Sequence, residues 1–165
     1  MEKSRKDLRL RNWDYSEVGC YFVTYCTHKH NLLFGTIQEE SNDSGSVKVS
    51  LSTAGLTCRA AIENIPIRYP FVSLENYVVM PNHVHLLCSI NGKSEGNERS
   101  LLSRIVGFAK SETTRELRKS GYVGEVWQRG FYDHIVRNDA DFERIFKYID
   151  DNPAKWAEDK FHPEG

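Results

Sequence analysis

The spacing of hydrophobic residues along the chain predicts four strands and three helices. Runs rich in aromatic and β-branched residues predict strands at 18–27, 72–80, 83–90 and 127–137. Apolar residues at helical spacing predict helices from Ser52 or Thr53 to 65, at 100–119 and at 139–151. Polar segments at 41–46 and 91–97 predict loops. The expected order is therefore strand, helix, strand, strand, helix, strand, helix.

This order of elements predicts an α+β fold of the ferredoxin-like type. In that fold an antiparallel sheet carries helices packed on one face, and here a C-terminal helix with a tyrosine is added. The length of 165 residues and the hydrophobic share of 39% suit one domain with a substantial core. We expect this domain to span 18–157, after a basic N-terminal arm at 1–17 and before a short tail at 158–165.

Composition and charge exclude several classes of protein. No apolar run approaches the length needed to span a membrane, and the charged N-terminal residues lack the apolar core of a secretory signal, so a cytoplasmic location is expected. The four cysteines form no C-x-x-C pair and are predicted to be free thiols without a catalytic role. The net charge of -1 gives no bulk signal for nucleic acid, so any DNA contact must be local.

Two basic patches could provide such local contacts. One is the N-terminal arm, and the other is the segment 99–119, where six basic residues accompany only two acidic ones. With two arginines near the last predicted strand, the candidate DNA-binding residues are Arg104, Lys110, Arg115, Arg118, Arg129 and Arg137. Trp127, Phe131 and Tyr132 could stack on bases, although core packing is the more frequent role of such aromatic residues. A solvated surface is the alternative interpretation of both patches.

Two histidines flank one hydrophobic residue in the segment VMPNHVHLL at 79–87. Because side chains two apart on a strand point the same way, His83 and His85 can present two imidazoles on one sheet face while Val84 enters the core on the other. This is the geometry of a two-histidine metal chelate, and a polar pair on a solvent-facing strand is the alternative. A second pair with this spacing, at 28–30, surrounds a lysine at a strand end, so we favour the pair inside the apolar strand.

The last predicted helix could supply a nucleophile and a further metal ligand. Its apolar stripe consists of Phe142, Ile145, Phe146 and Ile149. Tyr148 lies at the border of this stripe, and Asn152 lies four residues further on, hence on the same helix face. A phenol oxygen and a carboxamide oxygen could therefore converge on one spot near the sheet. The alternative is a half-buried core tyrosine followed by an asparagine that ends the helix before Pro153.

Three longer segments follow one another along the chain. They are VVMPNHVHLL at 78–87, VWQRGFYDHIVRN at 126–138 and FERIFKYIDDNPAKW at 142–156. In this order and separation they resemble the motifs of the HUH single-tyrosine transposases, most closely the REP-associated tyrosine transposases. The resemblance covers most of the chain, from Tyr21 to Trp156. It implies a ferredoxin-like domain that binds single-stranded or hairpin DNA and cuts it with the help of a divalent metal, Mg²⁺ or Mn²⁺.

The resemblance also implies roles for individual residues. His83 and His85 would be the metal-binding pair, Asn152 would complete the metal site, and Tyr148 would be the nucleophile. Its attack would give a 5′-phosphotyrosine link and free a 3′-OH, and a hydroxyl could later attack that link and rejoin DNA without ATP. Imidazole ligands also suit Zn²⁺ or Ni²⁺, so the residue types alone do not fix the ion.

The sequence leaves several alternatives open. An active DNA-nicking and strand-transfer enzyme is favoured over a domesticated relative that recognises hairpin DNA without cutting. A phosphoesterase with two H-x-S/T motifs is disfavoured because none of the six histidines begins such a motif. Tyr132 is the rival nucleophile, but its neighbours offer no partner at the spacing of Asn152. Both a homodimer and a monomer are compatible with the sequence, as are active sites formed within one subunit or between two.

Overall fold

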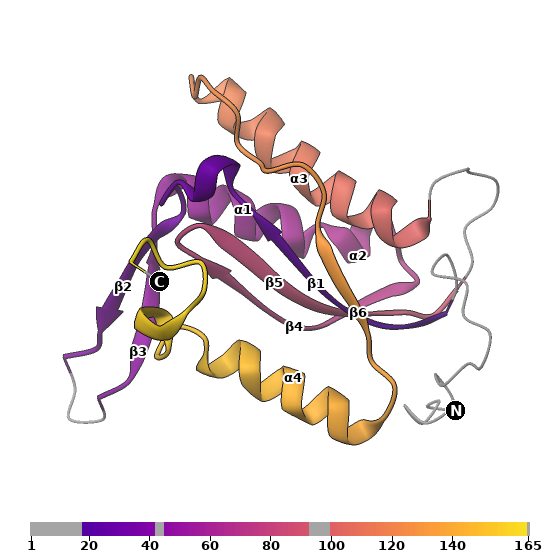
Figure 1. Ribbon diagram of the computed structural model, residues 1–165. Coiled ribbons are helices and arrows are strands. Elements are labelled where there is room, and N and C mark those ends of the chain that lie inside the picture. Colours follow the sequence, from indigo (N-terminus) through magenta and orange to yellow (C-terminus); the bar gives the residue numbers. More distant parts are fainter. Residues whose placement is uncertain (1–17, 42–44, 93–99, 165) are drawn as a thin grey trace.

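A four-stranded antiparallel sheet with the order β4-β5-β1-β6 forms the centre of the molecule (Figure 1). The computed structural model describes residues 18–41, 45–92 and 100–164. The strands are β1 (Gly19–Cys26), β4 (Val72–Met80), β5 (His83–Ile90) and β6 (Tyr132–Ile135). Each central strand is connected through a helical crossover to an edge strand, β1 to β4 and β5 to β6, so the topology is the predicted ferredoxin-like one.

The two longer helices that follow β1 and β5 cover one face of the sheet. They are α1 (Thr53–Glu63) and α3 (Leu101–Lys119), and the short α2 (Ile65–Arg68) follows α1. Alternate strand residues such as Val23, Val84 and Leu86 form the main hydrophobic core with these helices. Ser52 and Ser100 begin the two helices by accepting hydrogen bonds from the backbone N–H groups of the first turns. The two helix starts match the prediction from sequence.

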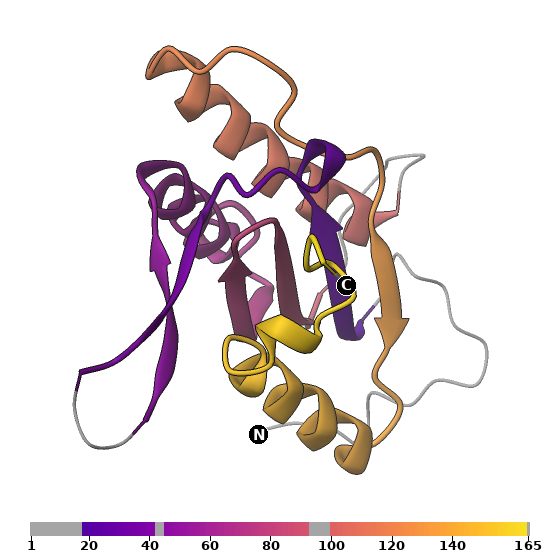
Figure 2. The ribbon, with the colours of Figure 1, turned by 60° about the vertical axis from the view of Figure 1, so that its left-hand side comes forward.

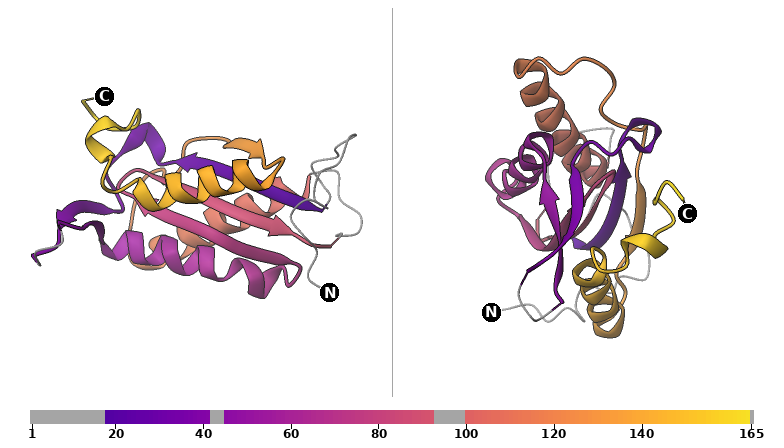
Figure 3. Two further views of the ribbon diagram at one scale, coloured as in Figure 1. Left: turned by 90° about the horizontal axis from the view of Figure 1, so that it is seen from below. Right: turned by 90° about the vertical axis from the view of Figure 1, so that its left-hand side faces the viewer.

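The last helix, α4 (Asp139–Asp151), lies on the opposite face of the sheet (Figure 3). Its buried residues Phe142, Ile145 and Ile149 pack with Leu87 and other residues of that face in a second, smaller core. Asn138 begins the helix by accepting a hydrogen bond from Asp141 N. The sheet is therefore the middle layer of three, and the predicted apolar stripe holds α4 against it.

Two features of the fold differ from the sequence-based expectation. A hairpin of β2 (Gly35–Glu39) and β3 (Val47–Leu51), which was not predicted, lies between β1 and α1 and extends away from the main sheet (Figures 1 and 2). The strand expected at 127–137 is much shorter. Before β6, Trp127 forms only an isolated bridge with Thr27. Between this bridge and the paired residues of β6 the chain turns at Gly130, whose φ is +79°, and this turn interrupts the strand.

The segment after α4 folds back toward the turn that joins β4 to β5. It contains a short 3-10 helix, η3 (Trp156–Glu158), and it is drawn in yellow in Figure 2. The residues expected to form a short tail thus lie beside the sheet. The predicted N-terminal arm and most of the predicted loop at 91–97 lie outside the described residues. Within the described ranges, no helix combines the length and apolar character that a membrane crossing requires.

Candidate active site

The two histidines of β5 lie on the sheet face that α4 covers, and Val84 between them enters the main core. Both imidazoles are buried, with 0% of His83 and 2% of His85 exposed, and their ring centroids lie 4.6 Å apart. The strand alternation therefore places the pair side by side, as the sequence predicts. The second pair, His28 and His30, instead lies in a turn after β1 in which His30 has a φ of +54°.

Hydrogen bonds to the Nδ1 atoms determine which nitrogen each histidine presents to the site. Asn82 Nδ2 donates to the backbone oxygens of His30 and Phe161, so its Oδ1 faces His83 Nδ1 at 2.8 Å and accepts a hydrogen bond from the Nδ1–H group. His85 Nδ1 lies 2.6 Å from Thr24 Oγ1. With both Nδ1 atoms held in this way, the Nε2 atoms are left to bind a ligand.

The Nε2 atoms of both histidines are buried and have no hydrogen-bond partner in the described part of the chain. Burial lowers the pKa of His83 to about 3 and lowers the pKa of His85 well below its ordinary value. Both rings are therefore neutral at physiological pH, and a neutral imidazole nitrogen is a metal donor. Since a buried polar atom without a partner costs about 1–3 kcal/mol, the two Nε2 atoms favour a bound ion.

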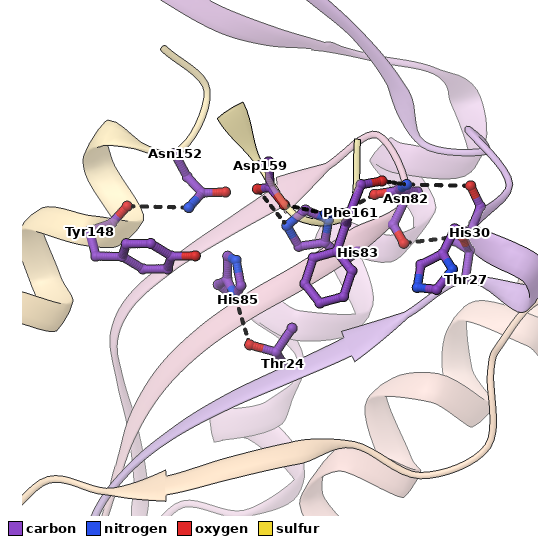
Figure 4. Close-up of polar contacts among 10 residues, drawn as sticks. All are labelled: Thr24, Thr27, His30, Asn82, His83, His85, Tyr148, Asn152, Asp159 and Phe161. Atoms are coloured by element: carbon purple, nitrogen blue, oxygen red, sulfur yellow. Dashed lines mark hydrogen bonds and ion pairs between the residues drawn. The ribbon is translucent and has the colours of Figure 1, made fainter. Parts of the chain in front are cut away.

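Two side-chain oxygens accompany these nitrogens (Figure 4). Asn152, which ends α4, is buried, and its Oδ1 has no hydrogen-bond partner among the described residues. Asp159, in the C-terminal segment, has one ligand atom that lies within 4.8 Å of those of His83 and His85. Two imidazole nitrogens and two oxygens are a donor set that fits a divalent cation. The structure thus shows a possible metal site of His83, His85 and Asp159.

Asp159 was not found from the sequence, whereas Asn152 was proposed as the further ligand. The segment after Pro153 has no helical or strand-like spacing, so no pattern places a carboxylate near the histidines. The available signal was Trp156 and Phe161, two large aromatic residues in an otherwise polar segment. Such residues indicate that a chain end packs against the protein.

Tyr148 lies one helical turn before Asn152 and borders the histidine pair. Its ring centroid is 5.3 Å from that of His85 and 6.1 Å from that of Phe22, and 43% of the residue is exposed. In Figure 4 the hydroxyl points toward the two histidines. A hydroxyl that is near the possible metal site and open to solvent can reach a DNA phosphate bound there.

Tyr132, the rival nucleophile, lies on the edge strand β6. The sheet register places it opposite Thr24, which in turn lies opposite His85. Tyr132 therefore shares the face of the histidines but lies two strands away from His85, a spacing of about 10 Å between strands. Lys160 Nζ lies 5.6 Å from the centroid of its ring.

The structure divides the candidate DNA-binding residues into two groups. Arg104, Lys110, Arg115 and Arg118 belong to α3, which covers the sheet face opposite the histidines. Lys110 Nζ donates to the backbone oxygens of Gln128 and Gly130, and Arg118 donates to Tyr122 O. Contacts with DNA by this group stay a prediction.

The second group flanks β6. Arg129 and Arg137 are exposed, one before and one after the strand. Arg129 lines a hollow between β1 and β6 together with Thr24 and Tyr132. Because Thr24 contacts His85, this hollow adjoins the histidine pair. Trp127 packs on Tyr25 and Phe34 in the core, as expected for such an aromatic residue.

Comparison with known proteins assigns the chain to a family. The family described as "Transposase IS200 like" matches residues 17–152. An uncharacterized protein of Haemophilus influenzae is 29% identical over 175 residues, which cover 96% of this chain and 93% of that protein. Another Haemophilus influenzae protein, provisionally named a REP-associated tyrosine transposase, is 28% identical over 123 residues, which cover 63% of this chain and 66% of that protein.

A solved structure shares the fold described above. It is that of a REP-associated tyrosine transposase bound to a REP hairpin, with a TM-score of 0.63 and 20% sequence identity, and the match covers 92% of this chain and 76% of that chain. At this identity the likeness shows the fold. The family match includes both the strand with His83 and His85 and the helix with Tyr148. The chain belongs to the IS200-like transposase family.

Proposed function

We propose that this protein is a single-stranded DNA endonuclease and strand transferase in which Tyr148 is the nucleophile. The observation that carries the proposal is the position of the Tyr148 ring, 5.3 Å from His85 and beside two buried imidazole nitrogens that have no hydrogen-bond partner among the described residues. Its hydroxyl would attack a DNA phosphorus. The bond from the tyrosine oxygen to phosphorus forms, the bond from phosphorus to the 3′ oxygen breaks, and a proton replaces the one lost from the phenol by binding the leaving 3′ oxygen, which departs as a 3′-OH.

The side chains of the site would hold a divalent ion, Mg²⁺ or Mn²⁺, through His83, His85, and oxygens of Asn152 or Asp159. When bound, the ion would neutralise charge on the scissile phosphate as the transition state forms. Asn82 Oδ1 keeps His83 in the tautomer that leaves Nε2 available, and Thr24 Oγ1 can accept a hydrogen bond from His85 Nδ1 in the same tautomer. The packing of α4 on the sheet would hold the Tyr148 hydroxyl near the scissile phosphate of a bound DNA strand.

The substrate we propose is single-stranded DNA that carries a hairpin. The solved structure with the same fold is bound to a REP hairpin, which supports this choice. Arg129 and Arg137 are exposed near the edge strand and would neutralise phosphates along the route to the site. The phosphotyrosine keeps the energy of the phosphodiester bond, so a DNA hydroxyl can attack it and complete strand transfer without ATP.

A covalent-adduct assay tests the proposal. Labelled hairpin DNA with single-stranded flanks is incubated with the protein and Mn²⁺, and the products are separated under denaturing conditions. We expect a protein-linked band with the wild type and with Tyr132→Phe, and none with Tyr148→Phe, which removes only the attacking oxygen. A band that persists in Tyr148→Phe but is lost in Tyr132→Phe would refute the assignment. Salt-sensitive hairpin binding without any adduct would instead favour a non-cleaving DNA-binding protein.

A further inference from the structure

The C-terminal segment makes specific contacts with the histidine strand. The ring of Phe161 lies 4.7 Å from that of His83, and the ring of Trp156 lies stacked at 6.1 Å on the same imidazole. Asn82 Nδ2 donates to Phe161 O at 2.7 Å, and the exposed His30 ring stacks on Phe161. These contacts place residues 156–161 over the Nε2 side of the pair. We call residues 156–161 the C-terminal strap.

The strap carries one acidic group into the site. The side chain of Asp159 is 5% exposed. Its Oδ1 accepts a hydrogen bond from Phe161 N at 2.8 Å, whereas its Oδ2 lies 3.7 Å from His83 Nε2, too far for a hydrogen bond. The carboxylate therefore lies near two neutral nitrogens that have no hydrogen-bond partner in the ranges that the structure describes. Burying a negative charge is costly even with the hydrogen bond from Phe161 N, and a divalent cation between these atoms would reduce the cost.

We propose that Asp159 binds the divalent ion together with His83 and His85, and that this bond fastens the C-terminal strap over the active site. The inference rests on the metal site of the proposed function and adds an anionic ligand from outside α4. A carboxylate adds an anionic oxygen donor to the neutral imidazoles, and oxygen donors are the ligand type that suits Mg²⁺ and Mn²⁺. The position of the strap then depends on metal occupancy.

Direct measurement of Mn²⁺ binding by the full-length protein without DNA tests the ligand. In Asp159→Asn, Oδ1 can still accept from Phe161 N, so the hydrogen bond within the strap can be kept. We expect this variant to bind Mn²⁺ about tenfold to 100-fold more weakly than the wild type in calorimetry or in a titration followed by electron paramagnetic resonance. Glu158→Gln is the matched control, because it removes the same charge from an exposed neighbour and should bind within twofold of the wild type.

His83→Ala separates failure of this inference from failure of the metal site. If Asp159→Asn binds Mn²⁺ as the wild type does while His83→Ala does not, Asp159 is not a ligand and the proposed function stands. If His83→Ala also binds normally, the metal site itself is wrong. Asp159→Ala provides a second variant, and thermal melting checks that each protein is folded. An equal loss in Glu158→Gln would show that general charge causes the effect and would overturn the inference.

Proteolysis tests the strap independently. Lys160 is exposed and follows Asp159 directly, so trypsin reports how often the strap opens. By thermodynamic linkage, saturating Mn²⁺ must lower the equilibrium constant for opening of the strap by the same factor by which the closed strap, through Asp159, raises Mn²⁺ affinity. We expect saturating Mn²⁺ to slow cleavage after Lys160 about tenfold in the wild type and in Glu158→Gln, and to leave Asp159→Asn unchanged. Equal rates with and without Mn²⁺ in the wild type would refute the fastening of the strap.

Discussion

Replacing Thr24 by valine removes the side-chain contact to His85 Nδ1 and leaves the other side chains of the site unchanged. Thr24 Oγ1 lies 2.6 Å from His85 Nδ1, and both residues are buried. Valine has nearly the same shape as threonine, so it keeps the strand and the packing but offers no acceptor. In the variant a proton on His85 Nδ1 has no partner. The tautomer that leaves Nε2 available for a metal thus loses its stabilising contact.

The size of the effect follows from the cost of the missing hydrogen bond. A buried donor left without a partner costs about 1–3 kcal/mol. Since about 1.4 kcal/mol corresponds to a factor of ten, Mn²⁺ affinity should fall about 5-fold to 150-fold. The free energy of unfolding of the metal-free protein should fall less, because the proton can move to Nε2 in the absence of an ion. A large loss of affinity with a small loss of stability is therefore expected.

Calorimetry with Mn²⁺ measures the affinity, and denaturant unfolding of the metal-free protein measures the stability. Thr113→Val is the matched control, because Thr113 is also buried and donates a hydrogen bond, to Ala109 O, but it lies in α3 on the other side of the sheet. This control should leave Mn²⁺ affinity within twofold of the wild type. Wild-type affinity in Thr24→Val, or an equal loss in both variants, would refute the role of Thr24 in orienting His85.

Two further predictions concern packing and thiol chemistry. Gly55→Ala and Gly107→Ala should change stability in opposite directions. A Cβ at Gly55 would lie 2.1 Å from Phe34 O, whereas a Cβ at Gly107 would meet no atom of the described residues within 4 Å apart from its chain neighbours and the backbone of its own helix. We expect denaturant unfolding to show a loss of about 3 kcal/mol for Gly55→Ala and a gain of about 1 kcal/mol for Gly107→Ala. Burial raises the pKa of the Cys26 thiol to about 11, so a disulfide reagent at pH 8 should label the unfolded protein and leave the native one almost unlabelled; rapid native labelling would contradict this burial.

The strongest periodic patterns gave the most accurate sequence-based predictions. The strands at 72–80 and 83–90 and the helix at 139–151 match β4, β5 and α4: β5 is buried along its whole length, α4 buries an apolar stripe, and β4 is buried at both ends. The β2–β3 hairpin was missed because its strands are five residues long and largely open to solvent, so hydrophobic alternation is weak.

The same reasoning explains which parts of the site could be predicted. Local spacing predicts that His83 and His85 share one strand face and that Tyr148 and Asn152 share one helix face, because the periods of two and four lie within single elements. The roles proposed for these residues come from the resemblance to the transposase motifs. The contacts of Asn82 and Asp159 depend on how the C-terminal strap folds back across residues far apart in sequence. No local pattern encodes such a contact, so it required the structure.

The nitrogen donors and the oxygen-bearing side chains of the site come from different elements of the fold. Both histidines belong to a central strand, whereas Tyr148, Asn152 and Asp159 come from one continuous stretch that follows the start of α4. The alignment of these two groups therefore depends on how α4 is attached to the sheet.

A β-bulge in β4 supplies a polar part of that attachment. The register shifts between Leu74 and Asn76, and as a result these residues, two apart, face opposite sides: Leu74 packs in the main core, and Asn76 Nδ2 donates to Phe146 O at 3.1 Å and to Asp150 Oδ1 at 2.9 Å. In a regular strand both would point toward the main core. The extra residue therefore lets β4 hold the last two turns of α4, from which Tyr148 and Asn152 reach the histidines.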